Sequence, residues 1–558
     1  MKNFVNCRRV LAMVLALVTV MALLAGCGGS GNLPGGNNQG TEVDPSTLTF
    51  PLAETVTIKG LTNFPVGSES EPNNRTIFQR LEEDTNVHVE WKAIQSDQWG
   101  EKIQLEMSNV KTLPDFVFNA GFGDTDLLKY AKQGVIINLE EYIDKYMPNL
   151  SKVFADYPEY RAMCTDENGN IWALPWIEQL GAEKTAIQAV GNMSFINVAW
   201  LDFLGLEKPE TVEEFEAVLV AFRDNAEDLQ KEFNIEGDII PMACIMNDGD
   251  QDPYILINGF GEGYGDPDRG RHINVTDDLE VVCSATSEGF KKGTEWLHGL
   301  YAQGLIDVEA FTQDWSTYVA KGKSGRYGVC FSWDVANIAN LTDWEPLPVL
   351  TADVTNLTAQ NGSFTSGFDR GRCVITAAAE NPALVCAWLD QMYDPMQGPQ
   401  NNWGTYGEND EFDIFVMGTN EAGEPMLQHA PLGDASPVEV REAECVGGPL
   451  AILDEYYGVY VTCPDDAQYR LDWIKDYFTP DMNHKYVFPN VFMSADDTKE
   501  LSNLQADIQK TINAFKSNAV MNGFTDADWD QFMADLDGYG LDEYLAIFQK
   551  YVDAYYAE

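Results

Sequence analysis

Positive charge and histidine are scarce in this chain. Its 558 residues contain 35 lysines and arginines against 88 aspartates and glutamates, which gives a formal net charge of −53, and only five histidines. Such an anionic surface repels the phosphates of nucleic acids and of anionic lipids. The few histidines argue against a metal centre built from several imidazoles. The composition therefore excludes nucleic-acid binding and disfavours a histidine-rich metal site.

Three common catalytic signatures are also missing. The chain contains no G-x-S-x-G elbow, no phosphate-binding P-loop and no H-E-x-x-H motif. With 88 acidic residues, counting does not exclude the carboxylate pair of a glycoside hydrolase, which stays as an alternative. No segment after residue 27 is long enough and free enough of charge to span a membrane.

Cysteine lacks the spacing of a disulfide scaffold. Apart from Cys7 and Cys27, eight cysteines are spread between residues 164 and 463 without a C-x-x-C pair. Cys330 and Cys373 lie in apolar runs. We expect buried free thiols, with one or two long-range disulfides as the alternative.

Length and composition predict a folded protein with at least two lobes. Hydrophobic residues make up 45% of the chain and charged residues 22%, and 558 residues exceed what one core usually organises. Strand patterns and helix patterns alternate along the first part of the chain, which favours an α/β fold with a largely parallel sheet. The expected strands are 55–59, 87–91, 113–118 and 135–139, and the expected helices are 75–85, 98–108 and 127–132.

Local signals define further elements. Asn168-Gly169 predicts a tight turn that leads into a strand ended by Pro175. Thr211 with Glu214, and Thr525 with Asp528, indicate helix caps. An apolar stripe near the C-terminus predicts a long amphipathic helix, and the C-terminal part is expected to be mainly helical. The stripe consists of Leu501, Leu504, Ile508, Ile512 and Phe515.

The N-terminus has the pattern of an export signal. Lys2, Arg8 and Arg9 precede an uncharged run that is shorter than the roughly 20 residues of a spanning helix. The run ends in Leu-Ala-Gly-Cys, which resembles a bacterial lipobox, so Cys27 is the predicted lipidation site. Residues 28–47 are rich in Gly, Asn, Pro and Ser and have the composition of a flexible linker.

Two acidic loops resemble the start of an EF-type calcium loop. The loop from Asp166 has Ile171 and Ile177 where an EF-type loop needs Gly and Glu. The loop from Asp248 fails at the same two positions, and a looser oxygen-lined site there stays as an alternative.

Tryptophans with polar neighbours are the most informative set. Sugars stack their apolar C–H faces on aromatic rings while acidic and amide side chains bind the hydroxyls at the rim. Four tryptophans lie beside Pro, Asp or Asn, as an aromatic sugar cleft would require, although core packing is an equal alternative for each ring. They are Trp176, Trp315, Trp333 and Trp403.

Several longer segments together resemble a known family. The lipobox, the linker, EKIQLEMSNVKTLPDFVF, NGNIWALPW, WLDFLGLEKPETVEEFEAVL and YVAKGKSGRYGVCFSWD occur in this order. The chain is similar to the family 1 extracellular solute-binding lipoproteins of bacterial sugar ABC importers, in their long LipO-like branch. The resemblance implies a two-lobed α/β fold of the type found in maltose-binding proteins, with a ligand cleft between the lobes.

The resemblance also implies which residues bind the ligand. It places Asn119, Phe122, Trp176, Glu178, Trp333 and Asp334 at the cleft, with Asn119 standing where the family often has an aromatic residue. The predicted rim residues are Asn119, Glu178, Asp314, Asp334, Asp369 and Arg370, and the predicted platforms are Trp176, Trp315, Trp333, Phe368 and Trp403. Many members of the branch carry a calcium loop after the helix that corresponds to residues 211–223, and its acidic pattern is missing here, so we expect no metal there.

We therefore predict a monomeric, lipid-anchored receptor on the outer face of the cell membrane that delivers an oligosaccharide to an ABC importer. It needs no catalytic residue and no cofactor. The expected parts are a signal peptide at 1–27, a linker at 28–47, an N-terminal lobe at 48–173 plus about 346–395, and a C-terminal lobe at 174–345 plus about 396–558. The alternatives are a peptide or other non-sugar receptor on the same fold and a surface glycoside hydrolase.

Overall fold

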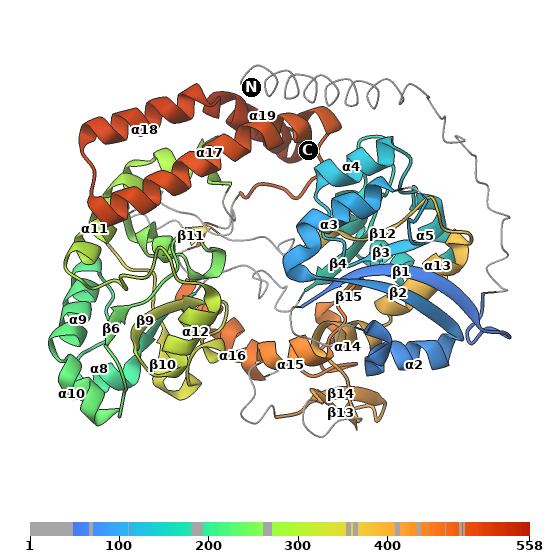
Figure 1. Ribbon diagram of the computed structural model, residues 1–558, viewed down its shortest axis with the longest axis horizontal. Coiled ribbons are helices and arrows are strands. Elements are labelled where there is room, and N and C mark those ends of the chain that lie inside the picture. The colour runs from blue at the N-terminus through green and yellow to red at the C-terminus, as the bar shows by residue number, and fades with distance from the viewer. Residues whose placement is uncertain are drawn as a thin grey trace, which may run out of the picture. The chain divides into compact units, whose positions relative to one another are not determined.

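Two separate β-sheets organise the described part of the chain (Figure 1). The computed structural model describes residues 48–65, 71–109, 111–179, 193–260, 271–352, 359–360, 367–407, 413–431, 437–463, 465–478, 482–483 and 486–557. The predicted signal peptide, Cys27 and the whole linker lie outside these residues. No helix in the described ranges is long and apolar enough to cross a membrane.

The first lobe is built on a six-stranded sheet with the order β15-β4-β12-β3-β1-β2. Its strands are β1 (Val56–Phe64), β2 (Val87–Gln95), β3 (Phe116–Phe118), β4 (Leu174–Glu178), β12 (Phe368–Ile375) and β15 (Leu450–Ile452). Its helices are α2 (Thr76–Thr85), α3 (Ser96–Ser108), α4 (Asp124–Lys132), α5 (Glu140–Tyr146), α6 (Pro148–Asp156), α7 (Pro158–Cys164), α13 (Pro382–Asp390), α14 (Gln397–Trp403) and α15 (Pro437–Glu444), and a hairpin of β13 (Phe415–Thr419) and β14 (Pro425–His429) follows α14.

The second lobe contains a four-stranded sheet with the order β10-β5-β9-β6. Its strands are β5 (Met193–Asn197), β6 (Ile240–Met242), β9 (Tyr327–Ser332) and β10 (Trp344–Pro346), with a separate hairpin of β7 (Ile273–Val275) and β8 (Val281–Cys283). Its helices are α8 (Val198–Leu204), α9 (Val212–Asp224), α10 (Ala226–Glu232), α11 (Glu288–Ala302), α12 (Trp315–Lys323) and α16 (Asp465–Trp473). A two-residue pair joins β11 (Ala359–Gln360) to β16 (Met482–Asn483).

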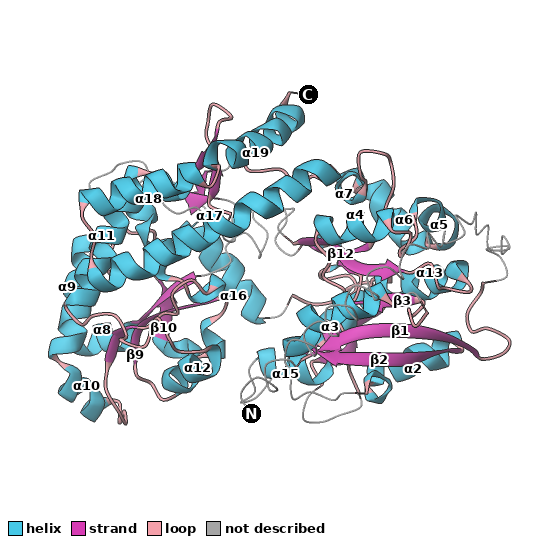
Figure 2. Ribbon diagram, turned by 45° about the horizontal axis from the view of Figure 1, so that its top comes forward, coloured by secondary structure: helices cyan, strands magenta, loops and turns pink. Residues whose placement is uncertain are grey.

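Three helices end the chain, as the apolar stripe predicted (Figure 2). They are α17 (Ala495–Asn522), α18 (Asp526–Gly538) and α19 (Leu541–Tyr556). Ile508 and Ile512 of α17 are fully buried in the core that also contains Phe195 and Val329 of the second sheet. The predicted caps are confirmed, because Thr211 and Thr525 each form a complete capping box.

Three details differ from the sequence expectations. Both sheets are mixed, because β12 runs antiparallel to β3 and β4, and β5 runs antiparallel to β9. Residues 135–139 form only the isolated bridge Ile136–Thr376 instead of a strand. Pro175 lies inside β4 and does not end it, because the register of β12 shifts between Asp369 and Cys373, opposite the missing N–H.

The first sheet also includes strands from outside residues 48–173 and about 346–395, which were expected to form the N-terminal lobe. Residues 174–178 and 450–452 were assigned to the second lobe, yet they form β4 and β15 of the first sheet. Short strands that complete a sheet from distant parts of the chain carry no local signal for the sheet they join. Six of the described cysteines are free thiols, five of them buried, as expected from their apolar neighbours: Cys164, Cys244, Cys330, Cys373, Cys386 and the half-buried Cys445.

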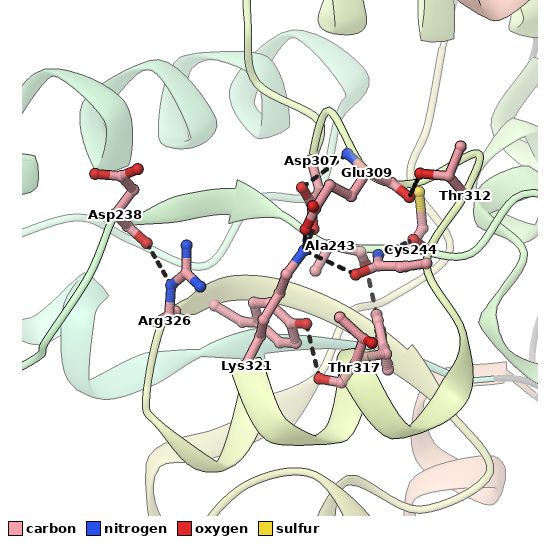
Figure 3. A network of polar contacts seen from close by, with 12 residues as sticks. Asp238, Ala243, Cys244, Asp307, Glu309, Thr312, Thr317, Lys321 and Arg326 are labelled. Carbon is pink, nitrogen blue, oxygen red and sulfur yellow. Dashed lines mark hydrogen bonds and ion pairs between the residues drawn. The ribbon is translucent and has the colours of Figure 1, made fainter.

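Buried lysines fix helices of the second lobe. Lys321 of α12 forms ion pairs with Asp307 at 2.7 Å and Glu309 at 2.5 Å and donates to Gln313 at 2.9 Å (Figure 3). Lys516 of α17, with a side chain only 1% exposed, pairs with Asp252 at 2.5 Å. Each pair is satisfied by further hydrogen bonds, which is the condition under which a buried charge is tolerated.

A first prediction concerns the Lys516–Asp252 pair. Lys516→Met is expected to lower the free energy of unfolding by about 3–5 kcal/mol, because it leaves the Asp252 carboxylate buried without its cation. Lys550 is the control, since its side chain is 60% exposed in an ion pair with Asp497, and Lys550→Met should cost less than about 1 kcal/mol. Urea denaturation measures both. Equal losses for the two variants would contradict the prediction.

A second prediction concerns Asp390, at the end of α13. Its carboxylate accepts the backbone N–H groups of Asn149 and Leu150 at 3.0 Å each, at the start of α6. Burial raises the pKa of Asp390 to about 7, although these two N–H groups oppose the rise. The folded state therefore holds this proton more tightly than the unfolded state, in which the pKa is about 3.9.

The resulting stabilisation is fully present below pH 4 and is lost as the pH rises through 7. Asp390→Asn, which carries no ionisable group, should lose less unfolding free energy between pH 5 and pH 8 than the unmodified chain. Urea titrations at several pH values test this. Parallel pH profiles for the two proteins would show that the carboxyl is already ionised in the fold.

Candidate functional site

The end of β4 presents Trp176 and Glu178 on one face of the first sheet, because residues two apart in a strand point to the same side. The Trp176 indole is half-buried, and its Nε1 donates to Asn402 Oδ1 at 3.4 Å. The Asn402 amide in turn donates to Glu178 Oε1 at 3.5 Å. One side chain from α14 therefore orients both predicted site residues.

The neighbouring strand β12 adds Asp369, which is the register partner of Trp176. The Asp369 carboxylate accepts the Gly371 N–H at 2.9 Å and lies 3.7 Å from the Arg372 guanidinium. Gly371 has no room for a side chain, since a Cβ would stand 1.8 Å from the Phe122 carbonyl oxygen. The sequence Asp-Arg-Gly-Arg thus lets β12 pass close to the Phe122 loop.

The Arg370 guanidinium binds groups from other parts of the protein. It forms an ion pair with Asp124 at 3.0 Å, and it donates to the Met163 carbonyl, to Asn490 Oδ1 at 2.6 Å and to the Val491 carbonyl at 2.9 Å. These partners come from α4, α7 and the segment that leads into α17. These contacts indicate a structural role for Arg370 more than the predicted role at the ligand rim, because four of the five N–H groups of the guanidinium have protein partners.

Arg372, which the sequence analysis did not select, is the more open guanidinium. Its side chain is 29% exposed, and its Cζ lies 5.8 Å from the centre of the Trp176 ring. Its Nε is buried and has no hydrogen-bond partner within the described residues. The sequence Asp-Arg-Gly-Arg contained a signal for Arg372, because it places two arginines of one strand near the predicted site. It did not show which of the two would be the more open.

We call Trp176, Glu178, Asp369, Arg372 and Asn402 the Trp176 group. It combines one aromatic ring, two carboxyl groups, an amide and a guanidinium on adjacent strands and the end of one helix.

A second group surrounds the end of β9. Asp334 caps the short helix η6 (Val335–Asn337) through the Ala336 N–H at 2.8 Å, and it accepts the Tyr469 hydroxyl at 2.5 Å. Trp333 is half-buried, and the Arg470 guanidinium lies over its ring with Cζ 3.8 Å from the centre. We call Trp333, Asp334, Tyr469 and Arg470 the Trp333 group. Tyr469 and Arg470 lie far from Trp333 in sequence, and no local pattern identified them.

Tyr457 connects the surroundings of the two groups. Tyr457, Trp333 and Leu471 pack against the same apolar cluster. The centre of the Tyr457 ring also lies 6.3 Å from the centre of the Trp403 ring. Burial raises the pKa of Tyr457 well above its ordinary value, and the Glu178 charge adds to this rise. The Tyr457 hydroxyl is buried without a hydrogen-bond partner among the residues that the structure describes. Tyr457 is thus a further candidate that sequence reasoning missed.

Three predicted aromatic positions are covered by protein. Trp403 is 2% exposed and packs edge-on against Phe415 and His429. Phe368 is 9% exposed and stacks on Tyr160, and Phe122 is 4% exposed and packs on Tyr130. These rings support the strands and loops around the site, because neighbouring aromatic residues close over them.

Asn119 stands where the resemblance implied an aromatic residue. Its φ is 54°, a left-handed conformation that Asn adopts more readily than bulky residues do. Its side chain donates to the Val446 carbonyl at 2.9 Å and accepts the Gly448 N–H at 2.6 Å. The departure therefore has a structural reason, since Asn119 fastens the loop that leads into β15.

Asp314 and Trp315 lie at the start of α12. Asp314 is its N-cap and accepts the Thr317 N–H at 2.8 Å. Trp315 is 38% exposed and stacks on Tyr318. In the described ranges we find no hydrogen bond, ion pair or ring contact between these two residues and either group above. They form a separate exposed aromatic position on the second lobe.

The same structure explains the acidic turn that resembled a calcium loop. Asp166 Oδ1 accepts the N–H groups of Asn168 and Asn170, and Oδ2 accepts Trp172 Nε1 at 2.8 Å. Both oxygens of the Asp166 carboxylate are therefore hydrogen-bonded to groups of the same turn and of Trp172. Asp252 of the second acidic loop pairs with Lys516. Within the described residues, no cluster of three or more His, Cys, Asp or Glu side chains could hold a metal ion.

The chemistry of the two groups suits recognition of a polar ligand with apolar faces. Two half-buried indoles offer flat surfaces, and the surrounding carboxyl, amide and guanidinium groups offer hydrogen bonds. Burial lowers the pKa of His272 and of His429 to about 3, so both imidazoles are neutral at physiological pH. Neither histidine belongs to either group.

Comparison with known proteins places the chain in a family. Residues 74–398 match the family described as bacterial extracellular solute-binding protein. The chain belongs to this family. The fructooligosaccharide ABC transporter substrate-binding protein FusA of Streptococcus pneumoniae serotype 4 is 40% identical over 544 residues, or 97% of each chain.

Solved structures agree with this membership. FusA in complex with kestose is 41% identical, with a TM-score of 0.83, over 90% of this chain and 99% of that chain. A solute-binding protein from Bifidobacterium longum infantis, described as binding HMO, is 22% identical with a TM-score of 0.73 over 90% and 99% of the two chains, and it supports the fold alone. The chain is thus a two-lobed α/β solute-binding protein, extracellular and not an enzyme, as predicted.

A third prediction separates the two arginines of β12 in this solute-binding protein. Arg370→Ala should lower the free energy of unfolding by about 3 kcal/mol or more, because it leaves Asp124 and several carbonyls buried without a partner. Arg372→Ala, with a longer ion pair and a more exposed side chain, should change it by about 1 kcal/mol or less. Chemical denaturation of both variants measures this difference. A similar loss for the two would contradict the distinction between them.

Proposed function

We propose that this protein is a lipid-anchored receptor that captures a fructo-oligosaccharide outside the cell and delivers it to an ABC importer. The observation that carries the proposal is the near full-length similarity to FusA, whose solved complexes contain kestose and fructo-nystose. The two groups of side chains described above supply a physical basis for the same ligand class.

Sugar recognition follows from the chemistry of these groups. In the proposal, Trp176 and Trp333 stack on the C–H faces of sugar rings. Glu178, Asp334, Asp369 and Arg372 bind hydroxyls, since carboxylates accept and a guanidinium donates hydrogen bonds. Asp314 and Trp315 would form a further contact on the second lobe. Asn119 and Arg370, which are hydrogen-bonded within the protein, and the buried rings of Phe122, Phe368 and Trp403 act from behind, by holding the loops and strands in place.

A two-lobed receptor also couples binding to recognition by the importer. A ligand that contacts both lobes stabilises the closed arrangement by its differential affinity for that state. The importer then reads the closed state. The predicted lipid on Cys27 and the linker at 28–47 would keep the folded body near the membrane, while its strongly acidic surface is repelled by anionic lipids.

A fourth prediction tests the ligand. Residues 44–558 form one compact unit, and a chain starting at residue 28 contains this unit entire. Calorimetric titration with kestose and nystose should show binding, and a ligand at 100 times its dissociation constant should stabilise the fold by about 2.7 kcal/mol. Maltotriose and a tripeptide serve as comparison ligands. Binding of the tripeptide alone would favour a peptide receptor, and release of fructose during incubation would favour a hydrolase.

Two substitutions locate the site in the same assay. Trp176→Ala and Trp333→Ala should each weaken kestose binding by roughly 10-fold or more, as expected for buried aromatic anchors. Tyr555, which is 56% exposed on α19, is the control, and Tyr555→Ala should leave the affinity unchanged. Unchanged affinity in both tryptophan variants would place the sugar elsewhere.

A further inference from the structure

The side chain that covers one face of Trp333 comes from a distant part of the chain. Arg470 lies on α16, and its Cζ is 3.8 Å from the centre of the Trp333 ring. The guanidinium also donates to the carbonyl of Trp333 itself. Arg470 therefore contacts both the ring and the backbone of a single residue, which holds the indole in one orientation relative to the chain that follows β9.

Arg470 is placed to hold the ring rather than to meet a ligand. The residue is 2% exposed, and its guanidinium is also 2.9 Å from the sulfur of Met193 in β5. A planar guanidinium on an indole face is a favourable cation–π arrangement, and its strength grows when water is excluded. Trp333 itself is half-buried, so part of this residue stays accessible to solvent although Arg470 lies over one face of its ring.

Tyr469, the residue before Arg470, holds Asp334, the residue after Trp333. Tyr469 donates its hydroxyl to Asp334 at 2.5 Å, and its ring contacts Trp473 of the same helix. Two consecutive residues of α16 thus hold two consecutive residues after β9. Trp473 packs in turn on Phe195 of β5, so α16 is itself anchored to the second sheet.

α16 lies outside the segment that matches the family. The match ends at residue 398, whereas α16 spans Asp465–Trp473. The orientation of Trp333 within the matched segment is therefore determined by a helix that follows it in the chain.

We infer that Arg470 is a positioning residue of the sugar site, which clamps one face of Trp333 so that the opposite face is presented to the apolar side of a sugar ring. This inference rests on the proposed function. In this inference Arg470 affects the affinity for the sugar without touching it. Arg470 acts only through Trp333, so its effect on affinity depends on the presence of the indole.

A double-mutant cycle on kestose affinity tests this dependence. The dissociation constant is measured by calorimetry for the unmodified chain, Trp333→Ala, Arg470→Met and the double variant. Trp333→Ala should weaken binding by roughly 10-fold or more, and Arg470→Met by roughly 3- to 10-fold, since an unclamped ring loses its orientation before binding. The double variant should match Trp333→Ala alone.

A merely structural role of Arg470 would give a different result. If Arg470→Met weakens binding by the same factor with and without Trp333, Arg470 acts on the fold or on the ligand directly, and the inference is overturned. Full affinity in Arg470→Met also overturns it. Arg441→Met is the matched control, because Arg441 is exposed and its Cζ lies 6.0 Å from the Trp403 ring, and it should leave the affinity unchanged.

Two further measurements keep the test decisive. If Arg470→Met melts below the assay temperature, Arg470→Lys replaces it, since it keeps the charge but lacks the planar fork, and an intermediate affinity is expected. The fluorescence of Trp333 is the difference between the spectra of the unmodified chain and Trp333→Ala, and between those of Arg470→Met and the double variant. Without ligand, the emission maximum of this difference should shift between the two pairs. Failure of the unmodified chain to bind any saccharide would overturn the proposed function, whereas sugar binding that Arg470→Met leaves intact overturns only the inference.

Discussion

A small number of buried cations determines how distant parts of this chain are held together. The sequence has far more acidic than basic residues, 88 against 35, yet arginine or lysine side chains stand at several junctions between remote segments. Lys516 attaches α17 to the second lobe, Arg370 joins β12 to the segment before α17, and Arg470 attaches α16 to the end of β9. A buried cation is tolerated only with its partners in place, so each of these contacts requires one arrangement of its segments.

The same residue type takes different roles according to the partners that surround it. Arg370 and Arg372 are two residues apart on β12, but protein acceptors fill the fork of Arg370 while Arg372 keeps a buried Nε without a described partner. Trp333 and Trp403 differ in the same way, because one ring stays half-buried beneath a guanidinium and the other is enclosed by aromatic neighbours. Availability for a ligand is therefore a property of the environment and not of the residue.

Several elements of the fold could be predicted because their signals are local. The caps at Thr211 and Thr525 depend on residues three positions apart, and the stripe of α17 depends on helical periodicity. The family resemblance likewise rests on short segments in a fixed order. Strand membership could not be read in this way, because β4 and β15 join the first sheet through pairing with strands far away in the sequence.

The sequence by itself determined the α/β class, the family and the candidate tryptophans, since composition, periodicity and motif order are properties of neighbouring residues. The export signal and the exclusion of nucleic-acid binding stay predictions from the same patterns. Only the tertiary structure decided which tryptophans stay partly exposed and which arginine is surrounded by protein acceptors. It also brought Tyr457, Tyr469, Arg470 and Asn402 to positions that no pattern around Trp176 or Trp333 indicated. The physical reason is that burial and hydrogen-bond satisfaction depend on contacts between residues hundreds of positions apart, which only the folded chain defines.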